Sequence, residues 1–224
     1  MKNYYLILLS IFILSCNNER VLLLPEVEQA EVTEVLDVSP AYIFYDETQP
    51  DSVLLNRKNL ISTTNWLVNV DKRLTLKQAI PHIKFLQDKK RDAKMHKNEN
   101  AKNYFTCNDT SIGDLGFIEF TDVSFHNNSK KEDVIKYSFK KEPTLLIEYN
   151  IDLKFKVYDV YAGKIRTYDK STYNNMSPEI FKGYGKIALY FNSNVSFQDY
   201  ISIKSKLQKI KSNKFIINTN EFIF

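Results

Sequence analysis

Glycine and histidine are scarce in this chain, and both scarcities exclude familiar kinds of site. Only 5 of the 224 residues are glycine. No glycine-rich phosphate-binding loop, dinucleotide-binding Gly-x-Gly-x-x-Gly motif or Gly-x-Ser-x-Gly nucleophile elbow is present. The three histidines, His82, His96 and His126, lie far apart and lack a cysteine or carboxylate at metal-ligand spacing. We therefore expect surface or rim histidines, with no metal and no other cofactor.

Clustered charge of one sign is also missing. The net charge of +4 is spread along the chain in alternating signs, whereas a nucleic-acid-binding surface gathers its lysines and arginines. We therefore expect no nucleic-acid partner. The stretch from Lys89 to Lys102 is strongly charged and is interpreted as a frayed helix end followed by a surface loop. Contact with anionic lipid or cell wall is the alternative for this stretch.

Apolar and aromatic residues, in contrast, are abundant. Hydrophobic residues make up 43% of the chain, which includes 15 Phe and 14 Tyr, and this is enough to build a core. Aromatic residues are frequent in strands and glycines are not. The composition therefore predicts an α+β fold, with antiparallel or mixed sheets and a few packed helices.

The N-terminal hydrophobic run, Tyr4 to Leu14, is too short to cross a hydrocarbon core of about 30 Å as a helix. A lysine precedes the run, and Ile13 to Cys16 follows it as a small-residue cleavage site, so residues 1–15 are interpreted as a signal peptide. This end of the chain resembles a bacterial lipobox. The resemblance implies that Cys16 carries a lipid that attaches the mature protein to the membrane. A plain signal peptide or an uncleaved anchor is the alternative.

Three expectations follow from a lipid on Cys16. Asn17 stands where an aspartate would imply inner-membrane retention, so the resemblance implies the outer membrane, with the leaflet left open. Cys107 becomes the only thiol, which excludes an internal disulfide, and we expect it to be a half-buried structural residue. Residues 16–38 are expected to form the anchor and an acidic tether that lifts the folded part off the membrane, with a helix from Val27 to Leu36 as one alternative.

Residues 39–224 are expected to form the α+β domain. In its first part, the sequence predicts three strands, at Ala41–Tyr45, Ser52–Asn56 and Asn65–Val70, and a helix at Leu74–Lys90. Pro81 lacks a backbone donor, so the helix is predicted to begin near Ile80 or to kink there.

The middle of the domain is interpreted as mostly strand. Strands are predicted over Gly116–His126, Val134–Phe139, Ile147–Val157 and Ile165–Tyr168. In the third of these ranges, apolar and polar residues alternate strictly. This alternation predicts one long antiparallel strand with one face exposed to water.

The last part of the chain predicts a strand at Ile187–Phe191, a helix from Ser196 to Ser212, and a strand at Lys214–Ile217. Ser196 is the predicted N-cap, with Asp199 three residues on. At an offset of 121 residues, the segment 66–90 shows the same order of strand, polar turn and helix. This similarity predicts two related halves, 40–126 and 134–224, with chance similarity as the alternative.

The C-terminal pattern is similar to the periplasmic domain of the ExbD/TolR biopolymer-transport family, in which a strand ends at a polar turn, an aromatic residue follows and a helix leads to another strand. The resemblance implies two ExbD-like strand–helix–strand halves. That family works through a proton-carrying aspartate in a membrane helix, and Tyr4 to Leu14 contains no acidic residue. The resemblance therefore does not extend to the proton-driven activity. In composition the chain also resembles lipoproteins of the Bacteroidetes group.

The remaining acidic and aromatic candidates are given structural interpretations. Asp109, Asp114 and Glu119 fit no calcium-binding loop, and an Asx turn is predicted around them. Asp46 and its glutamate neighbour are predicted to lie in a turn. Trp66 opens a strand and is predicted to be a core anchor, with an exposed binding aromatic as the alternative.

Together these observations predict an envelope lipoprotein that is not an enzyme and serves as a binding or scaffolding module. Its partners would be the membrane, through the lipid, and another envelope protein. One alternative is an accessory subunit of an ExbD/TolR-like proton-driven envelope complex, bound through the sheet edge after Phe215. The other is an enzyme whose site the sequence does not reveal.

Overall fold

The structure is a computed structural model of the chain and describes residues 20–93, 98–138, 144–152, 154–159, 162–169, 181, 183–210 and 215–224. Residues 1–15, Cys16 and His96 lie outside the described residues. Within those residues, no helix is long and apolar enough to span a membrane.

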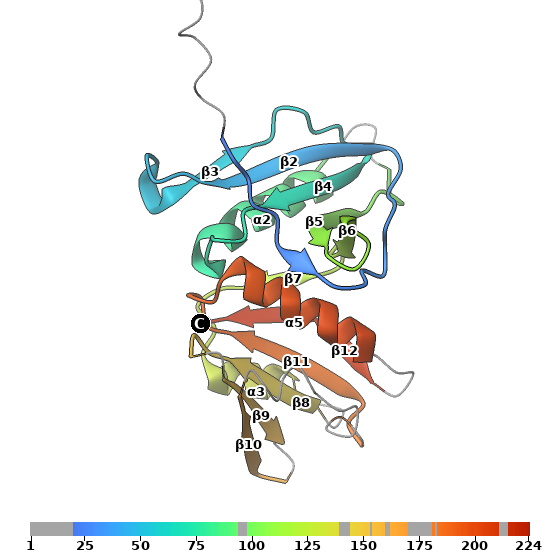
Figure 1. The fold of residues 1–224 in the computed structure, drawn as a ribbon. Coiled ribbons are helices and arrows are strands. Elements are labelled where there is room, and N and C mark those ends of the chain that lie inside the picture. Colours follow the sequence, from blue (N-terminus) through green and yellow to red (C-terminus); the bar gives the residue numbers. More distant parts are fainter. Residues whose placement is uncertain are drawn as a thin grey trace, which may run out of the picture.

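Two sheets of mixed strand direction, each with six strands in the described part of the chain, enclose α2 and α5 (Figure 1), which confirms the α+β class. The N-terminal sheet contains β1 (Glu26–Val27), β2 (Val38–Tyr45), β3 (Val53–Asn56), β4 (Asn65–Val70), β5 (Asn103–Asp109) and β6 (Asp114–Glu119). The C-terminal sheet contains β7 (Ser124–His126), β8 (Thr144–Tyr149), β9 (Phe155–Asp159), β10 (Lys164–Tyr168), β11 (Lys186–Phe191) and β12 (Ile216–Ile223). The helices are α2 (Leu76–Arg91), α3 (Lys131–Ser138) and α5 (Phe197–Ile210), and a short 3-10 turn, η1 (Pro50–Ser52), separates β2 from β3.

The two sheets share a common arrangement of four strands. The order β5-β4-β2-β3 in one sheet corresponds to β12-β11-β8-β9 in the other. The strand directions correspond as well, since β2 runs parallel to β4 and β8 runs parallel to β11. β4 and β11 are offset by 121 residues along the chain. The structure thus brings the segments 66–90 and 187–210 to equivalent positions, each as a strand followed by a helix between the sheets.

The two halves meet at the N-termini of α2 and α5 through paired backbone hydrogen bonds. The amide of Leu76 donates to the carbonyl of Val195 (2.9 Å), and the amide of Phe197 donates to the carbonyl of Leu74 (2.7 Å). Exchange of the two halves by the offset of 121 residues converts the first bond into the second, because Leu76 corresponds to Phe197 and Val195 corresponds to Leu74. At this contact the two halves are therefore related by approximate two-fold symmetry.

Both helices begin at capped residues. Ser196 caps α5 as predicted, because its Oγ accepts the amide of Asp199 (3.1 Å) and donates to that carboxylate (2.7 Å). Thr75 forms a capping box at the start of α2. The predicted start near Ile80 is therefore wrong. Pro81 lies inside α2 on its exposed side.

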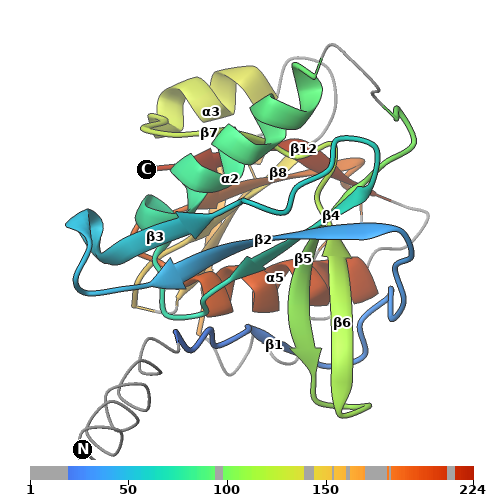
Figure 2. The same ribbon diagram turned by 90° about the horizontal axis from the view of Figure 1, so that it is seen from above.

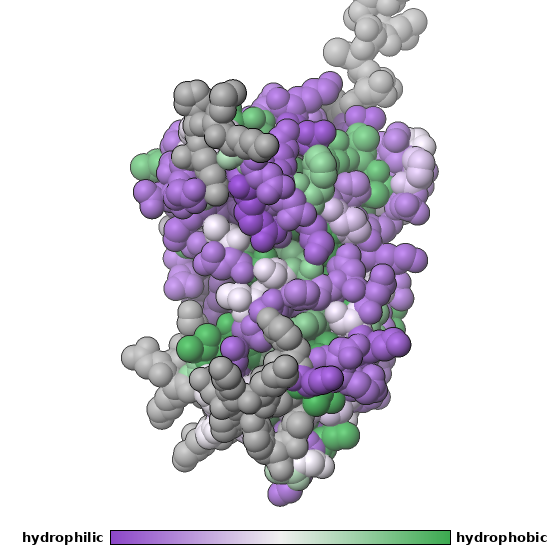
Figure 3. All heavy atoms as spheres, turned by 180° about the vertical axis from the view of Figure 1, so that it is seen from behind, coloured by the Kyte–Doolittle hydropathy of each residue, from purple (hydrophilic) through white to green (hydrophobic). Residues whose placement is uncertain are grey.

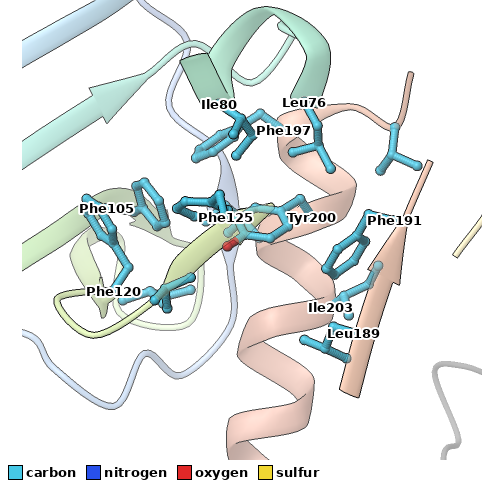
Figure 4. Packing of buried hydrophobic residues seen from close by; sticks show 14 of the residues in the cluster. Leu76, Ile80, Phe105, Phe120, Phe125, Leu189, Phe191, Phe197, Tyr200 and Ile203 are labelled. Atoms are coloured by element: carbon cyan, nitrogen blue, oxygen red, sulfur yellow. The ribbon is translucent and has the colours of Figure 1, made fainter. Parts of the chain in front are cut away.

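Buried side chains from both halves form one continuous core. Figure 4 shows its centre, where Phe105 of β5 stacks on Phe120 at a ring distance of 3.8 Å. Phe197 and Tyr200 of α5 meet the Phe105 ring edge-on, at 5.2 and 6.2 Å. Trp66 is 2% exposed, which confirms the core interpretation. Because rings from both halves interlock, neither half buries its apolar face alone.

Two predicted strands in the middle of the chain are wrong. The range Val134–Phe139 was predicted as a strand, whereas residues 131–138 form α3. Glu132 and Asp133 lie in its first turn, where negative charge favours the start of a helix, and Val134 is buried against the outer face of the C-terminal sheet. The single long strand predicted over Ile147–Val157 is instead the hairpin of β8 and β9.

The water-exposed face predicted for that strand is also wrong. All six residues of β8 are buried, because α3 packs on one side of this strand and α5 on the other. The alternation of apolar and polar residues continues through the turn, where Ile151 is 63% exposed. The hairpin was therefore mistaken for one long strand, because the alternation of apolar and polar residues continues through its turn.

The N-terminal segment belongs to the domain from Leu23 onward. The carbonyl of Leu23 accepts the amide of Lys72 (2.8 Å), and the carbonyl of Pro25 accepts the amide of Asn108 (2.8 Å). Val27 then pairs in β1, parallel to β5. The helix predicted as one alternative over Val27–Leu36 is therefore wrong, and this part of the chain does not lift the domain off a surface.

The strand predicted over Gly116–His126 is divided between the two sheets. Its first part is β6, and its last three residues form β7, which crosses to the C-terminal sheet and pairs in parallel with β12. β12 consequently lies between β11 and β7. The sheet edge after Phe215, predicted as an attachment site, is occupied at Asn220 to Phe222.

Candidate functional site

A groove runs beside α5 along the boundary between the two halves. It consists of three adjoining cavities of about 500, 250 and 620 Å³. Ser205 and Lys209 border the first and second cavities, and Glu31 and Gln208 border the second and third. The three cavities therefore adjoin one another, and together we call them the seam groove. From behind (Figure 3), the molecule shows a mostly hydrophilic surface.

The seam groove has one wall on α5 and the other on the N-terminal segment. The α5 residues that line it recur every three or four positions and so share one face of the helix: Gln198, Ser202, Ser205 and Lys209. The Gln198 amide joins the walls, since its Oε1 accepts the amide of Glu26 (2.8 Å) and its Nε2 donates to the Glu26 carbonyl (3.0 Å). The Gln198 side chain thereby makes the two backbone hydrogen bonds to β1 that a neighbouring strand would make.

Charge differs between the two walls. The N-terminal wall carries Glu26, Glu28 and Glu31, whereas the far part of the helix wall carries Lys206 and Lys209. A ligand lying in the groove would therefore meet carboxylates on one side and ammonium groups on the other.

Beneath the 620 Å³ cavity lies a buried cluster of three polar side chains, which we call the Glu221 cluster. Glu221 of β12 is fully buried, and its carboxylate accepts the Tyr200 hydroxyl (2.8 Å) and forms an ion pair with Lys204. Burial and the neighbouring Glu221 raise the pKa of Tyr200 well above its ordinary value. Lys204 also borders the cavity. The cluster satisfies its own charges, so it fixes α5 on β12.

A smaller cavity of about 310 Å³ adjoins the groove at Thr121 and Asp122. Lys90 borders this cavity and is 7% exposed; its ammonium group donates to the carbonyl of Lys102 (2.8 Å) and to Asn103 Oδ1 (3.0 Å) and lies 5.2 Å from the Trp66 ring centre. Burial lowers the pKa of Lys90 to about 8. No carboxylate forms an ion pair with Lys90 within the described part of the chain.

The predicted Asx turn is present at Asp109, and it has a second role. Ser111 donates to the Asp109 carboxylate from its amide (2.9 Å) and hydroxyl (2.7 Å), and the amides of Gln29 (3.0 Å) and Ala30 (2.6 Å) donate to the same group. Hydrogen bonds from Ser111 and Ala30 lower the pKa of Asp109 to about 2. Asp109 therefore holds the N-terminal wall of the groove in place. Glu119 lies at the far end of β6, where it pairs with Lys102.

The described histidines and the free thiol lie apart from one another. His82 is half-buried, and burial lowers its pKa. His126 is exposed in β7, where it stacks on Phe222 and hydrogen-bonds Asn220. Cys107 is completely buried instead of half-buried, and burial raises its pKa to about 12. Among the described residues, no three histidine, cysteine or acidic side chains are placed to hold a metal.

Sequence analysis missed Lys204, which borders the 620 Å³ cavity, and its ion-pair partner Glu221. One signal was available in the helix, because Lys204 follows Tyr200 by four positions and thus interrupts the apolar stripe. A charged residue on such a stripe needs a buried partner. The partner, Glu221, lies beyond the predicted end of the last strand, and only the pairing of β11 with β12 brings it near α5.

No protein-family model, curated protein or solved structure matches this chain.

Proposed function

We propose that this protein is a non-enzymatic binding module, attached through a lipid on Cys16 to the outer membrane, that holds an extended segment of another envelope protein in the seam groove. The observation that carries the proposal is the row of three adjoining cavities along one face of α5. From Gln198 to Lys209 the helix rises about 16 Å, which matches about five residues of extended peptide. The exposed polar side chains on both walls suit a chain with backbone donors and acceptors.

The polar groups around the groove support binding over catalysis. Tyr200 and Lys204 both contact the Glu221 carboxylate, and the Asp109 carboxylate accepts hydrogen bonds from Gln29 and Ala30 of the N-terminal segment and from Ser111. Groups held in this way position the groove walls. A general acid or base, in contrast, needs a proton that can move to or from a substrate.

Photo-crosslinking in cells tests the groove. A photoreactive residue at Gln208, which borders two of the cavities, should yield adducts of discrete mass with an envelope protein. The same residue at Thr167, on the exposed edge strand β10, is the matched control and should yield none. A Ser202→Trp substitution, which fills the groove, should abolish the Gln208 adducts, whereas Thr167→Trp should leave them intact. Equal adducts from positions 208 and 167 would contradict the proposal.

Membrane attachment is tested separately. The parent protein should stay with the membrane fraction after an alkaline wash, and its mature N-terminus should carry the mass of a lipid. Cys16→Ser should remove that mass and release the protein from the membrane. A Cys16→Ser protein that stays membrane-bound after the wash would refute the lipid anchor.

A further inference from the structure

The outer face of β2, β3 and β4 in the N-terminal sheet is free of charge. Strand registers place the following residues on this part of the face: Val38, Pro40, Tyr42, Phe44, Leu54, Asn56, Asn65, Leu67 and Asn69. None of these nine residues is charged, whereas 26% of the whole chain is charged; Glu26 of β1 and Glu119 of β6 lie on the other part of the face. Tyr42 and Phe44 stack at 5.9 Å, and with Leu54 they are partly exposed.

The equivalent face of the C-terminal sheet is covered. There α3 lies on β8 and β11, and Val134 is buried with Tyr190 and Phe222. Lys131 of α3 forms an ion pair with Glu148 of β8, which attaches the helix to the sheet. Figure 2 looks onto the N-terminal sheet from outside, and no described helix lies over it there. The two sheets thus share an arrangement of strands, but a described helix covers the outer face of the C-terminal sheet alone.

The chain connects Cys16 to this face by a short path. Arg20 pairs with Asp46, the residue that follows β2, at 3.3 Å, and Leu23 is bonded to Lys72. Arg20 is the fourth residue after Cys16, and a fully extended chain covers about 14 Å in four residue steps. A lipid on Cys16 would therefore hold the backbone of Arg20 within about 14 Å of the bilayer surface, and the Arg20–Asp46 side-chain pair joins Arg20 to the β2–β3 end of the sheet.

We infer that the outer face of β2, β3 and β4 lies on the phospholipid surface to which Cys16 is attached. Tyrosine, phenylalanine and leucine side chains on an uncharged face suit the interfacial region, where aromatic rings sit at the headgroup level. Contact through this face adds apolar burial to the lipid chains and fixes how the domain stands on the membrane. The seam groove is lined by none of the β2, β3 and β4 face residues, so it then remains open to the aqueous compartment. The inference rests on the lipid attachment in the proposed function.

Site-specific fluorescence on the lipidated full-length protein tests this orientation. Cys16 is blocked by lipid and Cys107 is completely buried, so one added surface cysteine can be labelled alone. Phe44→Cys and Leu54→Cys report on the face, and Thr167→Cys on β10 is the control. Each variant carries an NBD fluorophore and is reconstituted into phosphatidylethanolamine–phosphatidylglycerol vesicles, with or without nitroxide-labelled lipid. Circular dichroism checks that each variant is folded.

We expect the nitroxide lipid to quench positions 44 and 54 at least twofold and to leave position 167 unchanged, while aqueous iodide shows the reverse order. Positions 44 and 54 open to iodide on a vesicle-bound protein would refute the orientation and leave the lipid anchor intact. Protection from both quenchers would indicate a second protein copy on the face and would also refute it. Recovery of unlipidated protein in the supernatant would refute the anchor, and with it both this inference and the proposed function.

Discussion

The Glu221 cluster provides the sharpest test of how the two halves are held together. The perturbation is Lys204→Met, which keeps the length of the side chain and removes its charge. Glu221 is fully buried and Lys204 is 7% exposed, so the substitution leaves a carboxylate in the core with one hydrogen bond, from Tyr200. A buried charge that has lost its partner is poorly compensated, because water cannot reach it.

The expected loss of unfolding free energy is about 3–5 kcal/mol, the range found when one partner of a buried ion pair is removed. For a domain of this size, that loss lowers the melting temperature by roughly 6–20 °C. The matched control is Lys102→Met, because the Lys102–Glu119 pair is 2.8 Å long and its side chains are 50% and 35% exposed. An exposed pair contributes only about 0–1 kcal/mol.

Urea unfolding of the purified protein, followed by Trp66 fluorescence and far-UV circular dichroism, measures both losses. A triple variant that carries Tyr200→Phe, Lys204→Met and Glu221→Leu should regain most of the stability, because a buried ion pair can be replaced by apolar side chains of similar volume. If Lys204→Met costs no more than Lys102→Met, the cluster does not fix α5 on β12 and the reasoning fails.

Three further predictions concern the groove walls and the adjoining cavity. Gly116→Ala places a Cβ 2.4 Å from the Cβ of Ala30. It should lower the free energy of unfolding in urea by about 1–3 kcal/mol, and an added Ala30→Gly should restore the lost stability. Because the pKa of Asp109 is lowered to about 2, its stabilisation is complete above its ordinary pKa and is lost as pH falls towards 2; hydrogen exchange at the amides of Gln29 and Ala30 should accelerate in this range, and unchanged protection would contradict the role of Asp109. Burial lowers the pKa of Lys90 from 10.5 to about 8, so the unfolded chain binds more protons between these values and stability should rise with pH there; Lys90→Met should remove this rise in urea midpoints, and a slope equal to the parent's would count against it.

Local sequence signals were sufficient where one element's own residues decide its structure. The helix after Ser196 and the strands at Asn65–Val70 and Ile187–Phe191 were predicted at nearly their observed bounds. In each case an apolar period, a polar turn or a cap lies within a few residues of the element. The three-residue spacing of Ser196 and Asp199 is a local property of the chain, and the structure retains it.

Prediction failed where a distant segment covers a strand or helix. An alternating pattern indicates which residues can be buried together, but it does not show whether the chain turns midway or what lies on the second face. Ile147–Val157 divides into β8 and β9 at Asn150–Lys154, and β8 is buried on both faces because α3 and α5 pack against it. Residues 134–138, predicted as part of a strand, belong to α3, because tertiary packing of Val134 outweighs β propensity, which depends strongly on context.

By itself, the sequence determined the α+β class, the capped helix after Ser196 and the 121-residue spacing of two strand–helix segments, since these depend on composition and on contacts between near neighbours. Only the tertiary structure decided that β7 crosses to the second sheet, that Glu221 meets Lys204, and that the seam groove lies between α5 and the N-terminal segment. These features join residues that are far apart along the chain. Such contacts form only where the whole core closes, and no local pattern specifies them.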